Sequence, residues 1–149
     1  MENLFERIVD LLGKTPDHPD SRQFVRDLEE QPVFAGAYNF MKSGFMLVHE
    51  KHVFTAAIFH LSEWEDHPNS AYSGRLPGDV KANDDIEDVR EKLNIAPRIN
   101  VEIDSRAGSE EPHEEEYDLP QCTLRLSFDA TNRLTSVVAL RSPSIDAPR

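Results

Sequence analysis

The sequence predicts an α+β protein made of two tandem repeats, each a helix followed by an antiparallel hairpin, with the helices packed on an antiparallel sheet. Residues 117–140 give the clearest signal, because apolar and polar side chains alternate on both sides of a short polar loop. The same pattern occurs earlier, in residues 38–61, and a short amphipathic segment precedes each copy. At 149 residues, the chain is expected to form one compact domain from repeats 1–66 and 67–149.

The repeat is supported by an ungapped match between residues 20–32 and 85–97. Both segments open on Asp, carry an apolar pair four residues apart and close on Pro, as a short amphipathic helix does. In the hairpins, Tyr38 falls on Tyr117, Leu47 on Leu126, Thr55 on Thr135 and Ile58 on Val138. The alternative is chance similarity, because apolar periodicity makes many αβ segments look alike.

The N-terminal half is expected to contain two helices and three strands. Residues 2–12 carry a broad apolar stripe at helical spacing, and Gly13 is placed to end that helix. After a turn with two prolines, residues 21–30 form the second helix. The expected strands are 33–40, 45–49 and 53–61, with turns at 43–44 and 50–51.

Residues 63–78 join the two copies and hold Trp64 and Tyr72, which are unusual in a floppy linker. Asp84 or Asp85 caps a third helix that buries an apolar face. This face consists of Ile86, Val89 and Leu93. A strand is expected at 99–103, a polar excursion at 106–116, and a frayed tail over the last nine residues.

The net charge of the chain limits the classes of partner that it can bind. The formal net charge is −12, so phosphate backbones and anionic membrane surfaces repel the chain, and neither nucleic acid nor a membrane is an expected partner. A basic protein surface fits this charge, whereas the alternative is that the acidity only aids solubility.

Cysteine usage and the N-terminus indicate a cytoplasmic protein. Cys122 is the single cysteine, so an intramolecular disulfide and a thiolate zinc site are excluded, as suits a reducing compartment. Its strand-like context favours packing over reactivity. The first residues are acidic where a signal peptide needs bases, and no apolar run approaches the length of a membrane span.

No catalytic motif is present, so we expect a protein that is not an enzyme and uses no cofactor or metal. Several clusters of His and acidic residues are candidate metal ligands: His49 with His52, His60 with Glu63 and His67, and His113 with Glu114, Glu115 and Glu116. None has the spacing of a known metal motif, and such clusters are normally solvated surface.

Two acidic runs, each beside an aromatic residue, are the candidate binding residues, because aromatic anchors inside a charged rim are typical of protein interfaces. They comprise Glu63, Trp64, Glu65, Asp66, Glu114, Glu115, Glu116, Tyr117 and Asp118. The alternative is that Trp64 and Tyr117 belong to the core and the acids face water.

A resemblance to a known group of proteins favours one class of function. Residues 72–78, YSGRLPG, followed by the third helix, by Tyr117-Asp118-Leu119 and by the closing hairpin, resemble immunity proteins of bacterial contact-dependent and polymorphic toxin systems. This resemblance implies a toxin inhibitor that binds and neutralises a cognate protein toxin. The acidic charge of the chain favours a basic toxin, such as a nuclease or another enzyme with a cationic site. The chain departs from the pattern at Asn94, where glycine is expected, and in the acidic insert before Tyr117.

The predicted architecture is also similar to β-lactamase inhibitor protein, in which two such repeats form a concave sheet that grips an enzyme. This similarity concerns the fold and carries little functional weight. Two other classes therefore stay open: a protein-interaction or chaperone-adaptor module with another partner, and a small enzyme. The upstream gene separates the first two classes, because an immunity gene follows its toxin gene.

Overall fold

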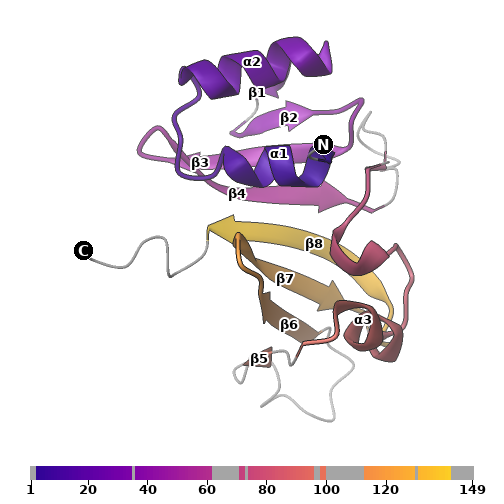
Figure 1. Cartoon of the computed structure of the whole chain (residues 1–149). Coiled ribbons are helices and arrows are strands. Elements are labelled where there is room, and N and C mark those ends of the chain that lie inside the picture. The colour runs from indigo at the N-terminus through magenta and orange to yellow at the C-terminus, as the bar shows by residue number, and fades with distance from the viewer. Residues whose placement is uncertain are drawn as a thin grey trace, which may run out of the picture.

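The described residues fold as α+β, with one eight-stranded antiparallel sheet and three α-helices (Figure 1). The computed structural model describes residues 3–34, 36–61, 71–72, 74–95, 98–99, 113–129 and 131–141. The predicted acidic run Glu63–Asp66, the proposed boundary between residues 66 and 67, and residues 100–112 and 142–149 lie outside this part. None of its helices has the length and apolar composition needed to cross a membrane.

The three helices begin and end at recognisable capping residues. α1 (Leu4–Asp10) starts where the Asn3 side chain accepts the Glu6 N–H at 2.8 Å, within the predicted segment 2–12. α2 (Pro19–Leu28) starts earlier than predicted, because the His18 side chain accepts the Asp20 N–H and Pro19 suits the first turn.

α3 (Ile86–Leu93) is capped by Asp85 in a reciprocal capping box with Asp88. Both α2 and α3 end on a left-handed residue, Glu29 with φ 58° and Asn94 with φ 54°. Asn tolerates this conformation better than most residues, so it serves where the sequence pattern expected glycine. A short 3₁₀ turn, η1 (Pro77–Asp79), precedes α3.

The strands form a sheet whose order is β1-β2-β3-β4-β8-β7-β6-β5, with β4 and β8 adjacent at the centre. Their bounds are β1 Val33–Phe34, β2 Tyr38–Phe40, β3 Phe45–Glu50, β4 Val53–His60, β5 Arg98–Ile99, β6 His113–Asp118, β7 Cys122–Phe128 and β8 Leu134–Arg141. Every neighbouring pair is antiparallel. The last strand of each half of the chain therefore forms the central seam of the molecule.

Two segments differ from the sequence-based expectation. Residues 33–40 were expected to form one strand but form β1 and β2, because the chain turns at Gly36, whose φ of 76° suits glycine. The polar excursion expected at 106–116 overlaps β6, which pairs with β7 over its whole length. Acids on both faces of β6 hide the alternation by which strands are recognised.

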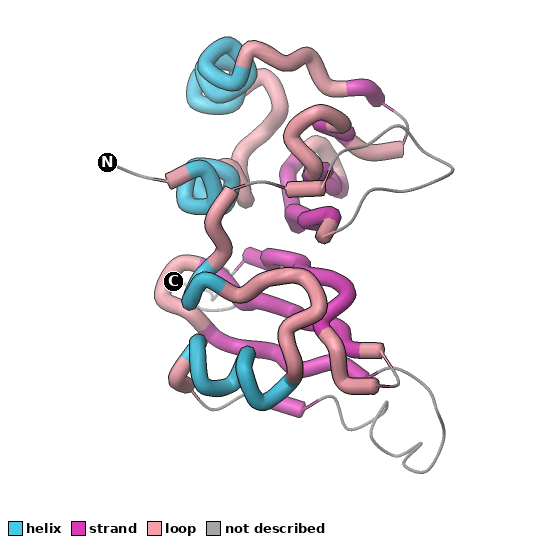
Figure 2. The backbone as a smooth tube through the Cα atoms, turned by 90° about the vertical axis from the view of Figure 1, so that its right-hand side faces the viewer, coloured by secondary structure: helices cyan, strands magenta, loops and turns pink. Residues whose placement is uncertain are grey.

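One hydrophobic core lies between the helices and the sheet. Figure 2 shows the helices gathered on one side of the strands. Phe5 of α1 packs on Phe59 of β4 with ring centroids 5.4 Å apart, and Phe24 of α2 meets Phe45 edge-on at 6.1 Å. Val89 of α3 is fully buried in the same core, so both halves share it.

Candidate interaction surface

The sheet has two unlike faces. One packs on α1, α2 and α3, whereas no helix of the described residues lies on the other (Figure 2). We call this second face the open face. Alternation along the strands places on it the side chains of Met46, Val48, Ala56, Ile58, Glu114, Glu116, Asp118, Thr123, Arg125, Ser127, Val138 and Leu140.

The strand register aligns these side chains in rows across the sheet. In one row, Met46 pairs with Ile58, and Ile58 pairs with Val138. The same row continues from Val138 to Arg125 and then to Glu116 on β6. The row thus passes from partly exposed apolar side chains over β3, β4 and β8 to an ion pair over β7 and β6.

A second row repeats this change of character. Val48 pairs with Ala56 and Ala56 with Leu140, after which the row reaches Thr123 and Asp118. The open face therefore has an apolar centre and an acidic flank.

The acidic flank consists of Glu114, Glu116 and Asp118, against which β7 sets one cation, Arg125. The Arg125 guanidinium donates to Glu116 at 2.9 and 3.0 Å and lies 3.9 Å from Glu114. Asp118 accepts the Thr123 hydroxyl at 3.0 Å. Among the described side chains that β6 and β7 place on this face, three carboxylates thus stand beside one guanidinium. The pairing also holds the side chains in place, which reduces what a partner must order on binding.

Two of the predicted binding residues lie on the other side of the sheet, and this corrects the sequence-based expectation. Glu115 and Tyr117 are both fully buried in the core under α3. The Arg90 guanidinium of α3 pairs with Glu115, and the Tyr117 hydroxyl donates to the same carboxylate at 2.8 Å. Because β6 alternates, only its even-numbered acids reach the open face. Glu115 and Tyr117 therefore join α3 to the sheet instead of meeting a partner.

The buried cluster shifts the proton affinities of its members. Burial raises the pKa of Tyr117 above its ordinary value of 10.0, and the hydrogen bond to Glu115 adds to that rise. The hydrogen bond to Glu115 raises the pKa of Arg90. The phenol therefore stays protonated and donates, while the guanidinium stays charged, so the three groups form a stable structural link at neutral pH.

The histidines of the described residues are not gathered into a metal site. Within that part, no three His, Cys, Asp or Glu side chains are placed to hold an ion. His49 packs against aromatic rings instead, with centroids 5.4 Å from Tyr38 and 5.7 Å from Phe34. His60 is buried at the end of β4, and burial lowers its pKa below the ordinary 6.5. The first acidic run, with Trp64, lies outside the described residues.

Sequence reasoning missed the apolar centre of the open face. The available signal was the composition of the two central strands, AAIF at 56–59 and VVAL at 137–140, which are apolar without interruption. Such runs mark strands with apolar side chains on both faces. Identifying the face also requires knowing that β4 and β8 are neighbours, which no local pattern reveals.

Comparisons of the chain with models of protein families, with curated proteins and with solved structures found no match.

Proposed function

We propose that this chain is a non-enzymatic immunity protein that acts in the cytoplasm and neutralises a cognate bacterial toxin. The partner is a basic protein, such as a nuclease or another enzyme with a cationic site. The open face binds it, with Met46, Ile58 and Val138 at the centre and the acids of β6 beside them. The sequence-based expectation that Trp64 anchors the same partner stays part of the proposal.

The observation that carries this proposal is the open face itself. Sheet faces that meet only water usually carry polar side chains, whereas the centre of this face is apolar. An apolar patch beside charged residues marks a protein-interaction site. The carboxylates of β6 and the net charge of −12 favour a cationic partner, and they would accelerate its arrival.

We also propose that the open face arose from a duplication, as the predicted repeats imply. The register supports this, because Leu47 pairs with Ala57 as Leu126 pairs with Val137. Both hairpins also carry an irregularity at corresponding places, Val48/His49 and Ser127/Phe128. Ile58 and Val138, aligned in the sequence, pair with each other at the central seam.

One detail of the sequence alignment is corrected by the same register. Tyr38 lies opposite Leu47, whereas Tyr117 lies opposite Leu124. Position 117 thus corresponds to Phe40, which lies opposite Phe45, and Tyr38 corresponds to Glu115. A shift of two residues keeps the side chain on the same face, which is why the apolar pattern did not reveal it.

The proposal is tested with the product of the adjacent upstream gene. The two proteins are co-expressed, and we expect the chain to restore growth and to co-purify with that product. Val138→Arg places a cation in the apolar centre and should abolish both effects, whereas Glu91→Lys on the outer side of α3 should leave both intact. Failure of the unaltered chain to bind would contradict the immunity function and leave the adaptor class. Equal protection by Val138→Arg would contradict the open face as the binding surface.

A further inference from the structure

A cavity of about 320 Å³ lies between α2 and the strands of the first half. Its wall is largely apolar and includes Val25, Tyr38, Phe40, Leu47 and Phe54. Ligand pockets span about 300–1,000 Å³, so this volume suits a compact small molecule. The cavity lies on the helix side of the sheet and is separate from the open face.

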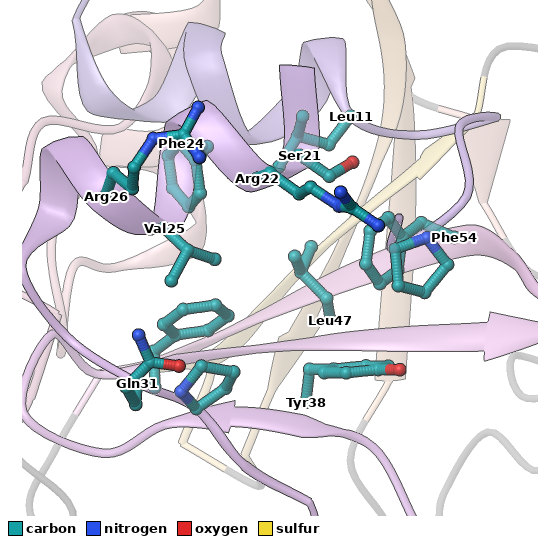
Figure 3. A pocket seen from close by; sticks show the side chains of 13 residues that line it. Leu11, Ser21, Arg22, Phe24, Val25, Arg26, Gln31, Tyr38, Leu47 and Phe54 are labelled. Carbon is teal, nitrogen blue, oxygen red and sulfur yellow. The ribbon is translucent and has the colours of Figure 1, made fainter. Parts of the chain in front are cut away.

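The cavity also has a cationic rim. Arg22 and Arg26 of α2 both line it, four residues apart on one helix. Figure 3 shows the Arg22 side chain reaching over Leu47 toward Phe54, whereas Arg26 turns away. The Arg26 guanidinium donates to Gln23 at 2.9 Å, whereas the Arg22 side chain donates no hydrogen bond to the described residues. The acid on which Arg22 acts is Asp17, whose pKa is lowered first by hydrogen bonds with Thr15 and its own backbone and then by the Arg22 charge. Arg22 is therefore available to a ligand.

This arrangement is unfavourable for the empty protein. Like charges four residues apart destabilise a helix. In a chain with net charge −12, carboxylates are abundant, yet positions 23–25 between the two arginines hold none, and the guanidinium groups point apart, that of Arg22 over the cavity and that of Arg26 away from it (Figure 3). An anion bound at Arg22 would offset this repulsion.

The second half of the chain carries different residues at the positions that correspond to the rim and wall of the cavity. In the alignment of 20–32 with 85–97, Arg22 and Arg26 fall on Glu87 and Glu91, so both charges are reversed. Val25 and Tyr38, two residues of the cavity wall, correspond to Arg90 and Glu115. That pair joins α3 to β6 through a buried ion pair. The cavity and its cationic rim are thus particular to the first half.

We propose that this cavity binds a small carboxylic acid with an apolar tail. The carboxylate pairs with the Arg22 guanidinium, and Arg26 adds to the positive potential at the rim. The tail lies against Val25, Phe40 and Leu47. Guanidinium groups recognise carboxylates through paired, charge-assisted hydrogen bonds, and the apolar wall accepts no second charge. A medium-chain fatty acid has this chemistry, whereas an amine or a dianion does not.

The probe is octanoate, measured by isothermal titration calorimetry on the full chain. Octanamide has the same tail without the charge, and octylamine carries the opposite charge. We expect octanoate to bind with one-to-one stoichiometry, and we expect octanamide to bind at least about tenfold more weakly, because a charge-assisted pair contributes about 1.5–3 kcal/mol. Octylamine should not bind.

Two variants and one control locate the site. Arg22→Gln should weaken octanoate binding at least about tenfold without changing the weaker octanamide affinity. Val25→Phe fills the cavity from the helix side and should abolish both. Arg75→Gln removes an equal charge far from the cavity in the sequence and should change neither. Each variant is first checked for an unchanged thermal unfolding profile.

Three results would overturn the proposal: no binding of octanoate to the unaltered chain, equal affinity for octanoate and octanamide, or unchanged octanoate affinity in both Arg22→Gln and Val25→Phe. If Arg75→Gln weakened binding as much as Arg22→Gln, the effect would be one of net charge, and the assigned site would also be wrong.

Discussion

Glu115 is the residue whose burial was hardest to predict from the sequence. It stands in a run of three glutamates that reads as solvated surface, yet only 1% of its side chain is exposed. A buried carboxylate is expensive unless it is paired and hydrogen-bonded, and Arg90 and Tyr117 supply both. Because Arg90 lies 25 residues earlier, the pair could be predicted only after the helix was placed on the strand.

We predict that removing Arg90 from this ion pair destabilises the protein more than neutralising Glu115 does. Arg90→Met leaves Glu115 buried and unpaired, so it should lower the free energy of unfolding by about 3 kcal/mol. Glu115→Gln leaves a guanidinium that is already 36% exposed and can reach water, so it should cost only about 1–2 kcal/mol. Urea denaturation of both variants checks this order, and a larger loss for Glu115→Gln would contradict it.

Cys122 is the residue whose role the sequence predicted best. Its position in a strand indicated packing, and the side chain is fully buried. Burial raises the pKa of its thiol to about 12, so almost no thiolate exists at neutral pH.

We therefore expect Cys122 in the native protein to react with a disulfide reagent at least about a hundredfold more slowly than in urea. The thiol then reports on opening of β7, because reaction requires its exposure. Native and denatured rates within about tenfold of each other would contradict the burial.

At the scale of elements, the sequence predicted the segments whose patterns are local. The third helix starts at Asp85 because its side chain accepts the Glu87 N–H, and this was visible as an acid before an apolar run. β7 was visible because buried and partly exposed side chains alternate from Leu124 to Phe128. The sequence predicted β1 and β2 as one strand, because the turn between them holds a single glycine in an apolar context.

We predict that the β7 core face carries a large share of the stability. Leu126 is fully buried and pairs with Val137, so Leu126→Ala should lower the free energy of unfolding by about 2–5 kcal/mol. Thr135→Ala, on an exposed position of the neighbouring strand, removes one hydrogen bond, from the Thr135 hydroxyl to the Ser127 carbonyl at 3.1 Å, and should cost no more than about 1 kcal/mol. Chemical denaturation measures both, and a loss below half a kcal/mol for Leu126→Ala would place that side chain outside the core.

At the scale of the molecule, the sheet places neighbouring acids of one sequence run on opposite faces. The acidic run of β6 was expected to act as one binding patch, but the strand sends Glu114, Glu116 and Asp118 to the open face and Glu115 to the core. The open face also brings together Ile58 and Val138, which lie 80 positions apart in the printed sequence. Such a surface depends on strand order, so composition could suggest its charge but not its apolar centre.

We expect the apolar centre and the acidic flank of the open face to affect different rate constants of partner binding. Charges beside an interface mainly set the association rate, whereas buried contacts at its centre set dissociation. Val138→Arg should therefore raise the dissociation rate of the cognate partner. Trp64→Ala should also raise the dissociation rate, because the loss of an anchoring indole costs about 2 kcal/mol or more of binding free energy.

The most direct test compares two double variants of equal charge in binding kinetics with the adjacent gene product. Glu114→Lys with Asp118→Lys reverses two acids on the open face, whereas Asp10→Lys with Glu91→Lys reverses two on the helices. At low salt we predict that the open-face variant associates at least about tenfold more slowly than the helix variant, and that high salt reduces the difference. Equal association rates for the two variants at both salt concentrations would contradict binding through the open face.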